Sequence, residues 1–326
     1  MTQSILRGVG SYLPEKVLTN KDLEENIDTT DEWIKERTGI SQRHVAAENE
    51  YTSDLAVVAA KKALKNAEMS IQDIDLIIVA TTTPDYTFPS TATIVQKKLG
   101  IKHGAAFDIQ AVCSGFIYGM SIADSMLKSR SAQNVLLIGA ETFSRILDWN
   151  DRSTCVLFGD GAGAFILSSD NVTDSGILNT LIRSNGEHRE LLYVDGGPSK
   201  SEYVGKLRMI GNQVFKHAVK DIASIMKECA ESYGVTISDI DWFVPHQANQ
   251  RILNGVAKRL SLNDEQVIST VSIHANTSAA SVPLAMDFAI KDGRIKRGDL
   301  IMLEAFGGGF TWGGFTTSLL IKKYIN

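Results

Sequence analysis

The sequence predicts an α/β protein made of two similar halves, and two observations support this prediction. Apolar runs of strand length alternate along the chain with segments whose apolar residues recur at helical spacing, which is the pattern of a layered α/β fold. In addition, three segments of the first half recur in one register in the second half. We place the boundary near residue 172, so the predicted halves are residues 1–172 and 173–326.

The elements of the first half follow from local patterns. A strand is expected at Ile5–Tyr12, and a helix is expected over Asp54–Asn66 because its apolar residues lie along one side. The continuous apolar run Ile74–Thr81 indicates a strand that is buried on both faces. A further strand is expected at Ala105–Ile109.

Segments of the first half recur in the second, two of them at offsets of 166 and 165 residues and a third between these two. The matching segments are Ile71–Ala80 with Ile237–Gln247, Asn134–Ala140 with Asp299–Ala305, and the turn at Cys113 with the turn at Asn276, which opens the helical stretch Pro283–Ile290. One match of this length could arise by chance, but three in one register favour duplication. Because ligand sites tend to lie where related halves meet, we expect the corresponding loops to converge there.

The composition is that of an ordinary soluble globular protein. Of 326 residues, 44% are hydrophobic and 22% are charged, and the net charge of -5 gives no general attraction to nucleic acid or to an anionic membrane. No apolar run approaches the roughly 20 residues of a membrane span. The three cysteines, Cys113, Cys155 and Cys229, are widely spaced and suggest a reducing compartment without disulfides or a metal site. We therefore expect a cytoplasmic protein that binds no metal.

Cys113 lies where a predicted strand gives way to a predicted helix. The strand Ala105–Ile109 ends in small residues, and apolar residues then recur at helical spacing from Phe116 to Leu127. The N-H groups at a helix start favour a thiolate and can bind an oxyanion beside it, so Cys113 is a candidate nucleophile. The alternative is that Cys113 is a small buried apolar residue, as free cysteines often are.

Two candidate partners of Cys113 come from the second half. His246 follows the predicted strand Trp242–Val244 directly, at the end where ligands bind in open α/β sheets. Asn276 lies in the turn that corresponds to the Cys113 turn. The alternatives are a loop histidine with its hydrogen bonds satisfied, and a turn or helix-capping asparagine.

Two glycine runs have different interpretations. The run Gly159–Ala164 resembles a dinucleotide-binding motif faintly, but Phe165–Leu167 reads as a strand where that motif needs a helix, so close backbone packing or a turn is favoured. The run Gly307–Gly309 lacks the residues of a phosphate-binding loop. It is either a flexible turn between strands or a turn whose glycine N-H approaches a substrate carbonyl.

Taken with these residues, the sequence closely resembles the 3-oxoacyl-acyl-carrier-protein synthase III family, nearly from end to end. The segments that carry the resemblance are Gly10–Pro14, Thr30–Ile34, Asp108–Phe116, Val244–Asn249, Asn276–Ser281 and Glu304–Gly313. The resemblance implies a thiolase-like fold of two duplicated α/β halves in αβαβα layers. It places the nucleophile at Cys113, the decarboxylation pair at His246 and Asn276, and the oxyanion hole at the N-H groups of Cys113 and Gly308.

The resemblance also implies binding residues for coenzyme A. Trp33 and Arg152 would stack on the adenine on either side, an arrangement in which an indole and a guanidinium both favour a planar ring. The other residues expected to contact coenzyme A are Thr29, Arg37, Gly211, Phe215 and Asn249. The family acts as a homodimer, and Phe88 corresponds to a residue that reaches the partner's acyl pocket.

The implied activity is that of the initiating condensing enzyme of bacterial type II fatty-acid synthesis. A short acyl-CoA, with acetyl-CoA as the default, would acylate Cys113 in a ping-pong reaction, and malonyl-acyl-carrier protein would then be decarboxylated and condensed to 3-oxoacyl-acyl-carrier protein. Acyl-CoA is a substrate, and no cofactor is expected. A papain-like hydrolase uses the same residue types in the same order, but its local cysteine motif is absent. An acyl-CoA-binding regulator without catalysis is disfavoured by the intact catalytic set.

A local basic patch is expected to bind the acidic carrier protein despite the negative net charge. Its expected members are Lys216, Lys220, Arg251, Lys258 and Arg259. The alternative is that these are solvated surface charges without a partner.

Overall fold

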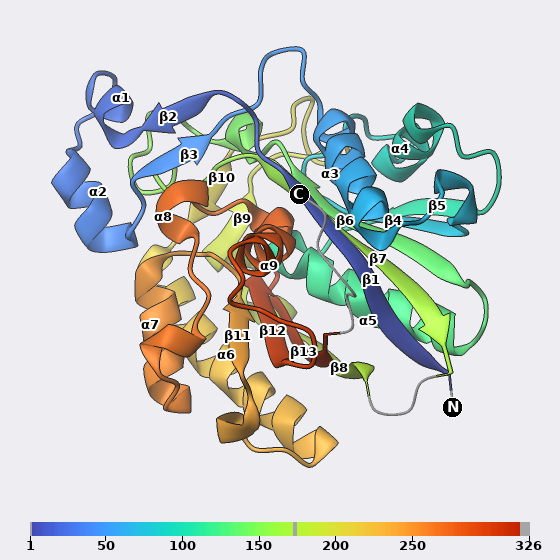
Figure 1. Ribbon diagram of the computed structural model, residues 1–326. Coiled ribbons are helices and arrows are strands. Elements are labelled where there is room, and N and C mark those ends of the chain that lie inside the picture. Colours follow the sequence, from blue (N-terminus) through green and yellow to red (C-terminus); the bar gives the residue numbers. More distant parts are fainter. Residues whose placement is uncertain (1, 172–174, 320–326) are drawn as a thin grey trace.

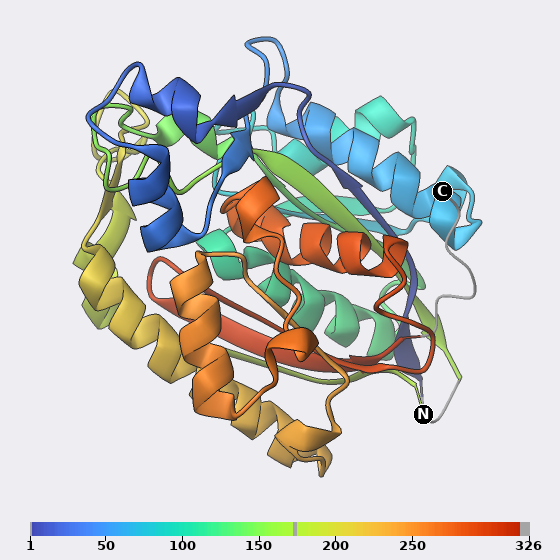
Figure 2. The same ribbon diagram turned by 60° about the vertical axis from the view of Figure 1, so that its left-hand side comes forward.

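A computed structural model describes residues 2–171 and 175–319 of the chain. Its two main sheets alternate with three layers of helices, so that the fold has five layers in the order αβαβα (Figures 1 and 2). This is the layered α/β architecture that the sequence predicts. The predicted boundary between halves, residue 172, lies outside the described residues.

The first sheet is built from the N-terminal part of the chain. Its strands are β1 (Gln3–Tyr12), β4 (Leu76–Ala80), β5 (Ala105–Ile109), β6 (Asn134–Glu141) and β7 (Gly161–Asp170), in the order β1-β7-β6-β4-β5. Strand β4 is parallel to both β5 and β6, whereas β7 is antiparallel to β1 and β6. The outer face packs on α3 (Thr52–Ala67) and α4 (Thr91–Leu99). The strands expected at residues 5–12, 74–81 and 105–109 and the helix expected at 54–66 are confirmed within a few residues.

The second sheet is built from the C-terminal part. Its strands are β8 (Gly176–Ser184), β11 (Trp242–Pro245), β12 (Leu300–Gly307) and β13 (Thr311–Ser318), in the order β11-β12-β13-β8. Strands β11 and β12 are parallel, and the other neighbours are antiparallel. The helix α6 (Gly211–Tyr233) covers its outer face, and α7 (Gln250–Leu260) packs on α6.

Two helices form the middle layer between the sheets (Figure 2). Both α5 (Gly115–Lys128) and α9 (Ser281–Lys291) contact strands of each sheet, and their apolar residues join one buried cluster that includes Phe116, Phe165 and Leu303. The glycines of β7 allow α9 to approach closely, because a Cβ on Gly163 would lie 2.6 Å from the Cβ of Pro283. The prediction that the Gly159–Ala164 run serves backbone packing is therefore confirmed.

The remaining elements lie around the carboxyl ends of the central strands (Figure 1). They are β2 (Val17–Thr19), α1 (Asn20–Glu24), α2 (Asp31–Thr38), β3 (Gln42–His44), β9 (Leu192–Val194), β10 (Leu207–Met209) and α8 (Val271–His274). Helix α2 begins where the Thr30 hydroxyl accepts a hydrogen bond from the Trp33 N-H, and it ends at Gly39, whose φ of 74° closes the helix. Across the described part of the chain, no helix is long and apolar enough to span a membrane.

Candidate active site

One cavity of about 510 Å³ brings the predicted catalytic residues together. Cys113, His246 and Asn276 all line it, and each side chain is at most 5% exposed. Arg37, which is exposed, lines the same cavity, so the space runs from the surface to the buried residues. Cys113 follows a strand of the first sheet and His246 follows a strand of the second. The loops after these two strands therefore meet at one cavity, as expected from the sequence.

Cys113 lies in a 3-10 turn, Val112–Ser114, between β5 and α5. Val112 has a φ of 51°, and the Ser114 hydroxyl holds the turn by donating to the carbonyl of Ala111 at 2.7 Å. Among the described residues, no backbone carbonyl accepts from the Cys113 N-H, which lies beside its own sulfur. A buried N-H beside the sulfur that is bonded to no backbone carbonyl is suited to hold an oxyanion.

The protonation of Cys113 differs from the expectation based on a helix start. Burial raises the pKa of the Cys113 thiol to about 12, and the neighbouring Glu141 acts in the same direction. The physical reason is that Cys113 precedes α5 in a separate turn and is enclosed by protein, so loss of solvation disfavours the thiolate. This environment therefore favours the thiol form of Cys113.

His246 is held on both its backbone and its ring. Its N-H donates to the Glu304 carbonyl at 2.9 Å, which continues the parallel pairing of β11 with β12. Its Nδ1 lies 2.6 Å from the Ser281 Oγ, which leaves Nε2 as the ring nitrogen without a partner among the described residues. Burial lowers the pKa of His246 to about 3, so the ring is neutral at ordinary pH.

Asn276 has a fixed amide orientation. Its Oδ1 accepts from the Ser278 N-H at 2.8 Å, so the Nδ2 group points elsewhere and can donate. The backbone of Asn276 also pairs with the loop before β7, since its N-H donates to Leu157 and its carbonyl accepts from Gly159. Asn276 is thus a turn residue, as the plain interpretation has it, and in addition it lines the cavity.

The glycine run at the end of β12 leads into a turn between two strands, as both of its interpretations require. Gly307 lies against the Cys113 turn, because a Cβ at that position would be 2.9 Å from the Cys113 nitrogen. At Gly308, a Cβ would be 2.9 Å from the Leu192 carbonyl oxygen. Gly308 is not among the residues that line the cavity, and its role in an oxyanion hole stays a prediction.

Most of the residues predicted to bind coenzyme A lie around the cavity. Five line it: Trp33, Arg37, Gly211, Phe215 and Asn249. Arg152 does not line it but lies beside Trp33, with its guanidinium carbon 5.2 Å from the ring centroid and an ion pair to Asp28 at 3.1 Å. Thr29 follows Asp28 and has a buried hydroxyl without a partner in the described structure.

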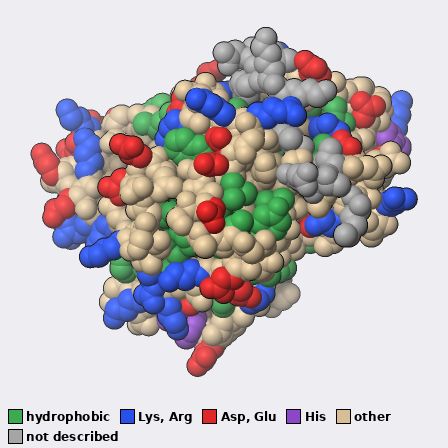
Figure 3. Space-filling model, turned by 60° about the horizontal axis from the view of Figure 1, so that its bottom comes forward, with side chains coloured by type: hydrophobic (Ala, Val, Ile, Leu, Met, Phe, Trp, Pro, Cys, Tyr) green, Lys and Arg blue, Asp and Glu red, His purple; other side chains and the backbone are tan. Residues whose placement is uncertain are grey.

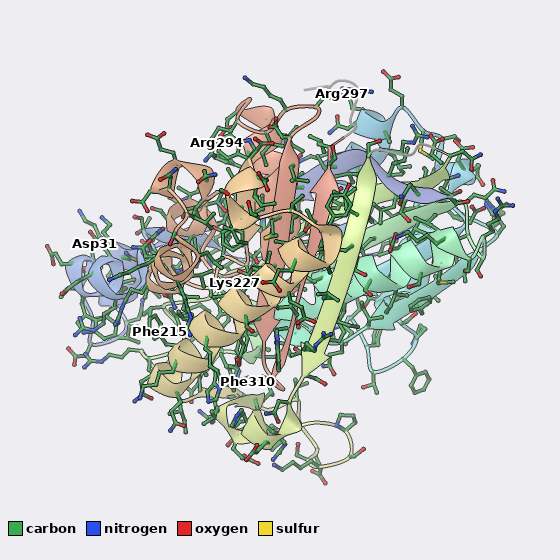
Figure 4. The ribbon with its side chains drawn as sticks, turned by 90° about the horizontal axis from the view of Figure 1, so that it is seen from below. Asp31, Phe215, Lys227, Arg294, Arg297 and Phe310 are labelled. Carbon is green, nitrogen blue, oxygen red and sulfur yellow. The ribbon has the colours of Figure 1, made fainter. Side chains whose placement is uncertain are left out.

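The predicted docking and dimer residues are distributed over the surface. Lys216 and Arg251 line the cavity, whereas Lys258 and Arg259 lie in the last turn of α7. Lys220 is on α6, and Figure 4 shows Phe215 near the start of the same helix. Lys and Arg side chains gather at the lower left of the face in Figure 3. Phe88 is 84% exposed in this single chain and is not among the residues that line the cavity.

Several cavity and support residues have no role predicted from the sequence. Thr38, Ser153 and Asn212 line the cavity, and Ser281 contacts His246. Ser281 belongs to the Asn276–Ser281 segment, so its position after Asn276 was a usable signal, whereas the others carry no distinctive pattern. Among the described residues, no group of three histidine, cysteine, aspartate or glutamate side chains could hold a metal ion.

Comparisons with known proteins agree over almost the whole chain. Residues 107–186 match the family described as 3-oxoacyl-[acyl-carrier-protein (ACP)] synthase III, and residues 230–319 match its C-terminal part. The β-ketoacyl-[acyl-carrier-protein] synthase III of Caulobacter vibrioides is 59% identical, over 97% of this chain and 100% of its own. That of Rhizobium meliloti is 56% identical, over 96% of this chain and 98% of its own.

Solved structures give the same result. The 3-oxoacyl-[acyl-carrier-protein] synthase III of Aquifex aeolicus has a TM-score of 0.93 and 48% identity, covering 97% of this chain and 99% of its own. The Pseudomonas aeruginosa enzyme has a TM-score of 0.94 and 38% identity, covering 99% of this chain and 100% of its own. Xanthomonas campestris OleA, at 23% identity and a TM-score of 0.86 over 97% of this chain and 98% of its own, shares the fold. The predicted thiolase-like fold is therefore confirmed.

Proposed function

Because the chain belongs to the 3-oxoacyl-[acyl-carrier-protein] synthase III family, an acyltransferase-type condensing enzyme that initiates fatty-acid synthesis, we propose a ping-pong condensation through an acylated Cys113. The substrates would be a short acyl-CoA and malonyl-acyl-carrier protein. The observation that carries the proposal is that one cavity holds a buried thiol together with two neutral hydrogen-bond donors, His246 and Asn276.

In the first half-reaction, the Cys113 sulfur attacks the thioester carbon of acyl-CoA. The new bond joins sulfur to the acyl carbon, the bond to the coenzyme A sulfur breaks, and the Cys113 proton leaves with coenzyme A as its thiol. The carbonyl oxygen becomes an oxyanion beside the Cys113 N-H, from which no backbone carbonyl among the described residues accepts a hydrogen bond. One such donor typically contributes about 3 kcal/mol to the transition state.

In the second half-reaction, malonyl-acyl-carrier protein occupies the space that coenzyme A leaves. The bond to the carboxylate breaks, CO2 departs, and the electron pair forms an enolate. The Nε2-H of His246 and the Nδ2-H of Asn276 would donate to its oxygen. The enolate carbon then bonds to the acyl carbon on Cys113, and the released thiolate takes up one proton from solvent. Neutral donors suffice, since a buried site makes each hydrogen bond to a developing charge strong.

The approach to Cys113 fits an elongated thioester. Trp33 and Arg37 line the outer part of the cavity with Phe215 and Asn249, which is consistent with a planar ring at the surface and a narrow chain leading inwards. Arg152 would move from the Trp33 ring to let adenine stack between them. We further propose that the basic residues of α6 and α7 dock the carrier protein, and that a homodimer places Phe88 at the partner's acyl pocket.

The direct test is product analysis with acetyl-CoA and malonyl-acyl-carrier protein. The proposal predicts an acetylated Cys113 in intact-protein mass spectra, one CO2 per turnover and a 3-oxoacyl-carrier-protein product. Cys113→Ala should lose all three, whereas Cys229→Ala, which removes a buried thiol of the core between α6 and β13, should keep them. Peptide cleavage, or binding of acyl-CoA without CO2 release, would overturn the proposal.

A further inference from the structure

Ser281 connects the middle helix layer to His246. It is the first residue of α9 and is 1% exposed. Its Oγ lies 2.6 Å from the Nδ1 of His246 and 3.3 Å from the backbone nitrogen of Gln247. These are the two hydrogen bonds of this hydroxyl within the described structure.

The two contacts together fix the direction of the hydrogen bond to His246. A backbone N-H can only donate, so the Ser281 oxygen accepts from Gln247. The hydroxyl proton then has one acceptor in reach, the Nδ1 of His246. If Nδ1 carried the ring proton instead, two donors would meet one oxygen, and the buried hydroxyl proton would have no acceptor, which is costly.

The peptide that donates to Ser281 is itself held in place. The Gln247 side chain is fully buried, and its Nε2 donates to the carbonyls of Pro245 at 2.8 Å and Ile268 at 3.1 Å. Its Oε1 accepts from the Thr270 N-H at 2.7 Å. Because both ends of this amide are satisfied, the Gln247 N-H keeps its direction toward Ser281.

We propose that Ser281 is a positioning residue that keeps the single ring proton of His246 on Nε2, the nitrogen that would donate to the enolate oxygen. The inference rests on the proposed function for its catalytic consequence. The assignment of the ring tautomer depends only on the hydrogen bonds of Ser281. It follows that His246 is a donor and does not serve as the base that removes the Cys113 proton, because its Nε2 is already occupied.

The kinetic test is Ser281→Ala. Loss of the hydroxyl lets the ring populate the Nδ1-H form, so we expect a fall in kcat for CO2 release of roughly 10-fold to 100-fold, by analogy with metal-bound histidines that lose the hydrogen bond to their other ring nitrogen. The KM for malonyl-acyl-carrier protein and the rate of Cys113 acetylation should stay near the wild-type values. Ser281→Thr, which keeps a hydroxyl, should restore CO2 release. The matched control is Ser168→Ala in β7, which removes a buried hydroxyl that donates to the Oδ1 of Asn134 in β6.

The spectroscopic test reads the tautomer without activity. Nitrogen-15 shifts of the His246 ring should show a protonated Nε2 and an unprotonated Nδ1 in the wild type, and a mixture of forms in Ser281→Ala. A protonated Nδ1 in the wild type, or unchanged ring shifts and CO2 release in Ser281→Ala, would overturn the inference. A wild-type enzyme that releases no CO2 would instead contradict the proposed function, and the ring shifts would still decide the role of Ser281.

Discussion

Gly307 packs directly on the backbone of Cys113. A Cβ added to Gly307 would lie 2.9 Å from the Cys113 nitrogen and 3.0 Å from both the Ala111 oxygen and the Ser114 nitrogen. Gly307 has no positive φ, so its backbone would accept any residue and the restriction is one of space. The hairpin of the second sheet therefore contacts the nucleophile turn of the first, and the position of the Cys113 N-H depends on both.

Gly307→Ala should slow acylation strongly while leaving the fold intact. The new methyl group must displace the Cys113 turn by a few tenths of an ångström, which misplaces the N-H that would hold the oxyanion, so we expect a loss of roughly 100-fold in acetylation rate. Stopped-flow or quenched mass spectrometry measures this rate. Gly186→Ala is the control, because a Cβ there meets nothing within 4 Å. Wild-type acetylation in Gly307→Ala would show that this contact does not position the site.

Glu304→Gln should stabilise the protein increasingly as the pH rises. Burial raises the pKa of Glu304 to about 8 from 4.5, and its Oε2 has no partner within the described residues. Between these values the unfolded chain releases a proton that the folded protein keeps, so this carboxyl costs stability as the pH rises from 4.5 to 8. The free energy of unfolding of the variant should therefore exceed that of the wild type by a margin that grows by at most about 1.4 kcal/mol per pH unit.

Urea unfolding at pH 5, 6.5 and 8 measures this advantage. Glu265→Gln is the control, since Glu265 is exposed and should show no comparable trend. An advantage of Glu304→Gln that is the same at pH 5 and pH 8 would show that the carboxyl titrates alike in the folded and unfolded protein.

The sequence predicted site residues well where a reactive residue type stands at the end of a strand or the start of a helix. It predicted poorly the properties that depend on how side chains pack in the folded protein. Cys113, His246 and Asn276 are distinctive residue types that each follow a predicted strand or open a helical stretch, so their convergence in one cavity was predictable. The protonation of Cys113 was not, because the helix-start argument contains no desolvation, and burial reverses its direction. The contact of Ser281 with His246 was missed because a serine at a helix start has many ordinary roles.

Arg251→Glu should weaken the use of the carrier protein. Arg251 is on α7, and its guanidinium carbon lies 5.6 Å from the centroid of the Phe215 ring on α6. Reversing its charge opposes an acidic partner, so the apparent KM for malonyl-acyl-carrier protein should rise several-fold, by less at high salt. Lys97→Glu on α4, which lies on the opposite side of the molecule from α7 (Figure 1), should have no effect. An equal loss with malonyl-CoA would show that Arg251 serves the cavity and not the carrier protein.

The central claim is that different residues of one cavity carry out acyl transfer and decarboxylation. The variant His246→Ala tests this claim most directly. The measurement pairs the mass of the acetylated protein after incubation with acetyl-CoA and the release of labelled CO2 from malonyl-acyl-carrier protein. Because neutral His246 donates from Nε2 and takes no proton from Cys113, the variant should form acetyl-Cys113 at close to the wild-type rate and release CO2 roughly 100-fold more slowly. Loss of acetylation in His246→Ala, or CO2 release at the wild-type rate, would contradict the account.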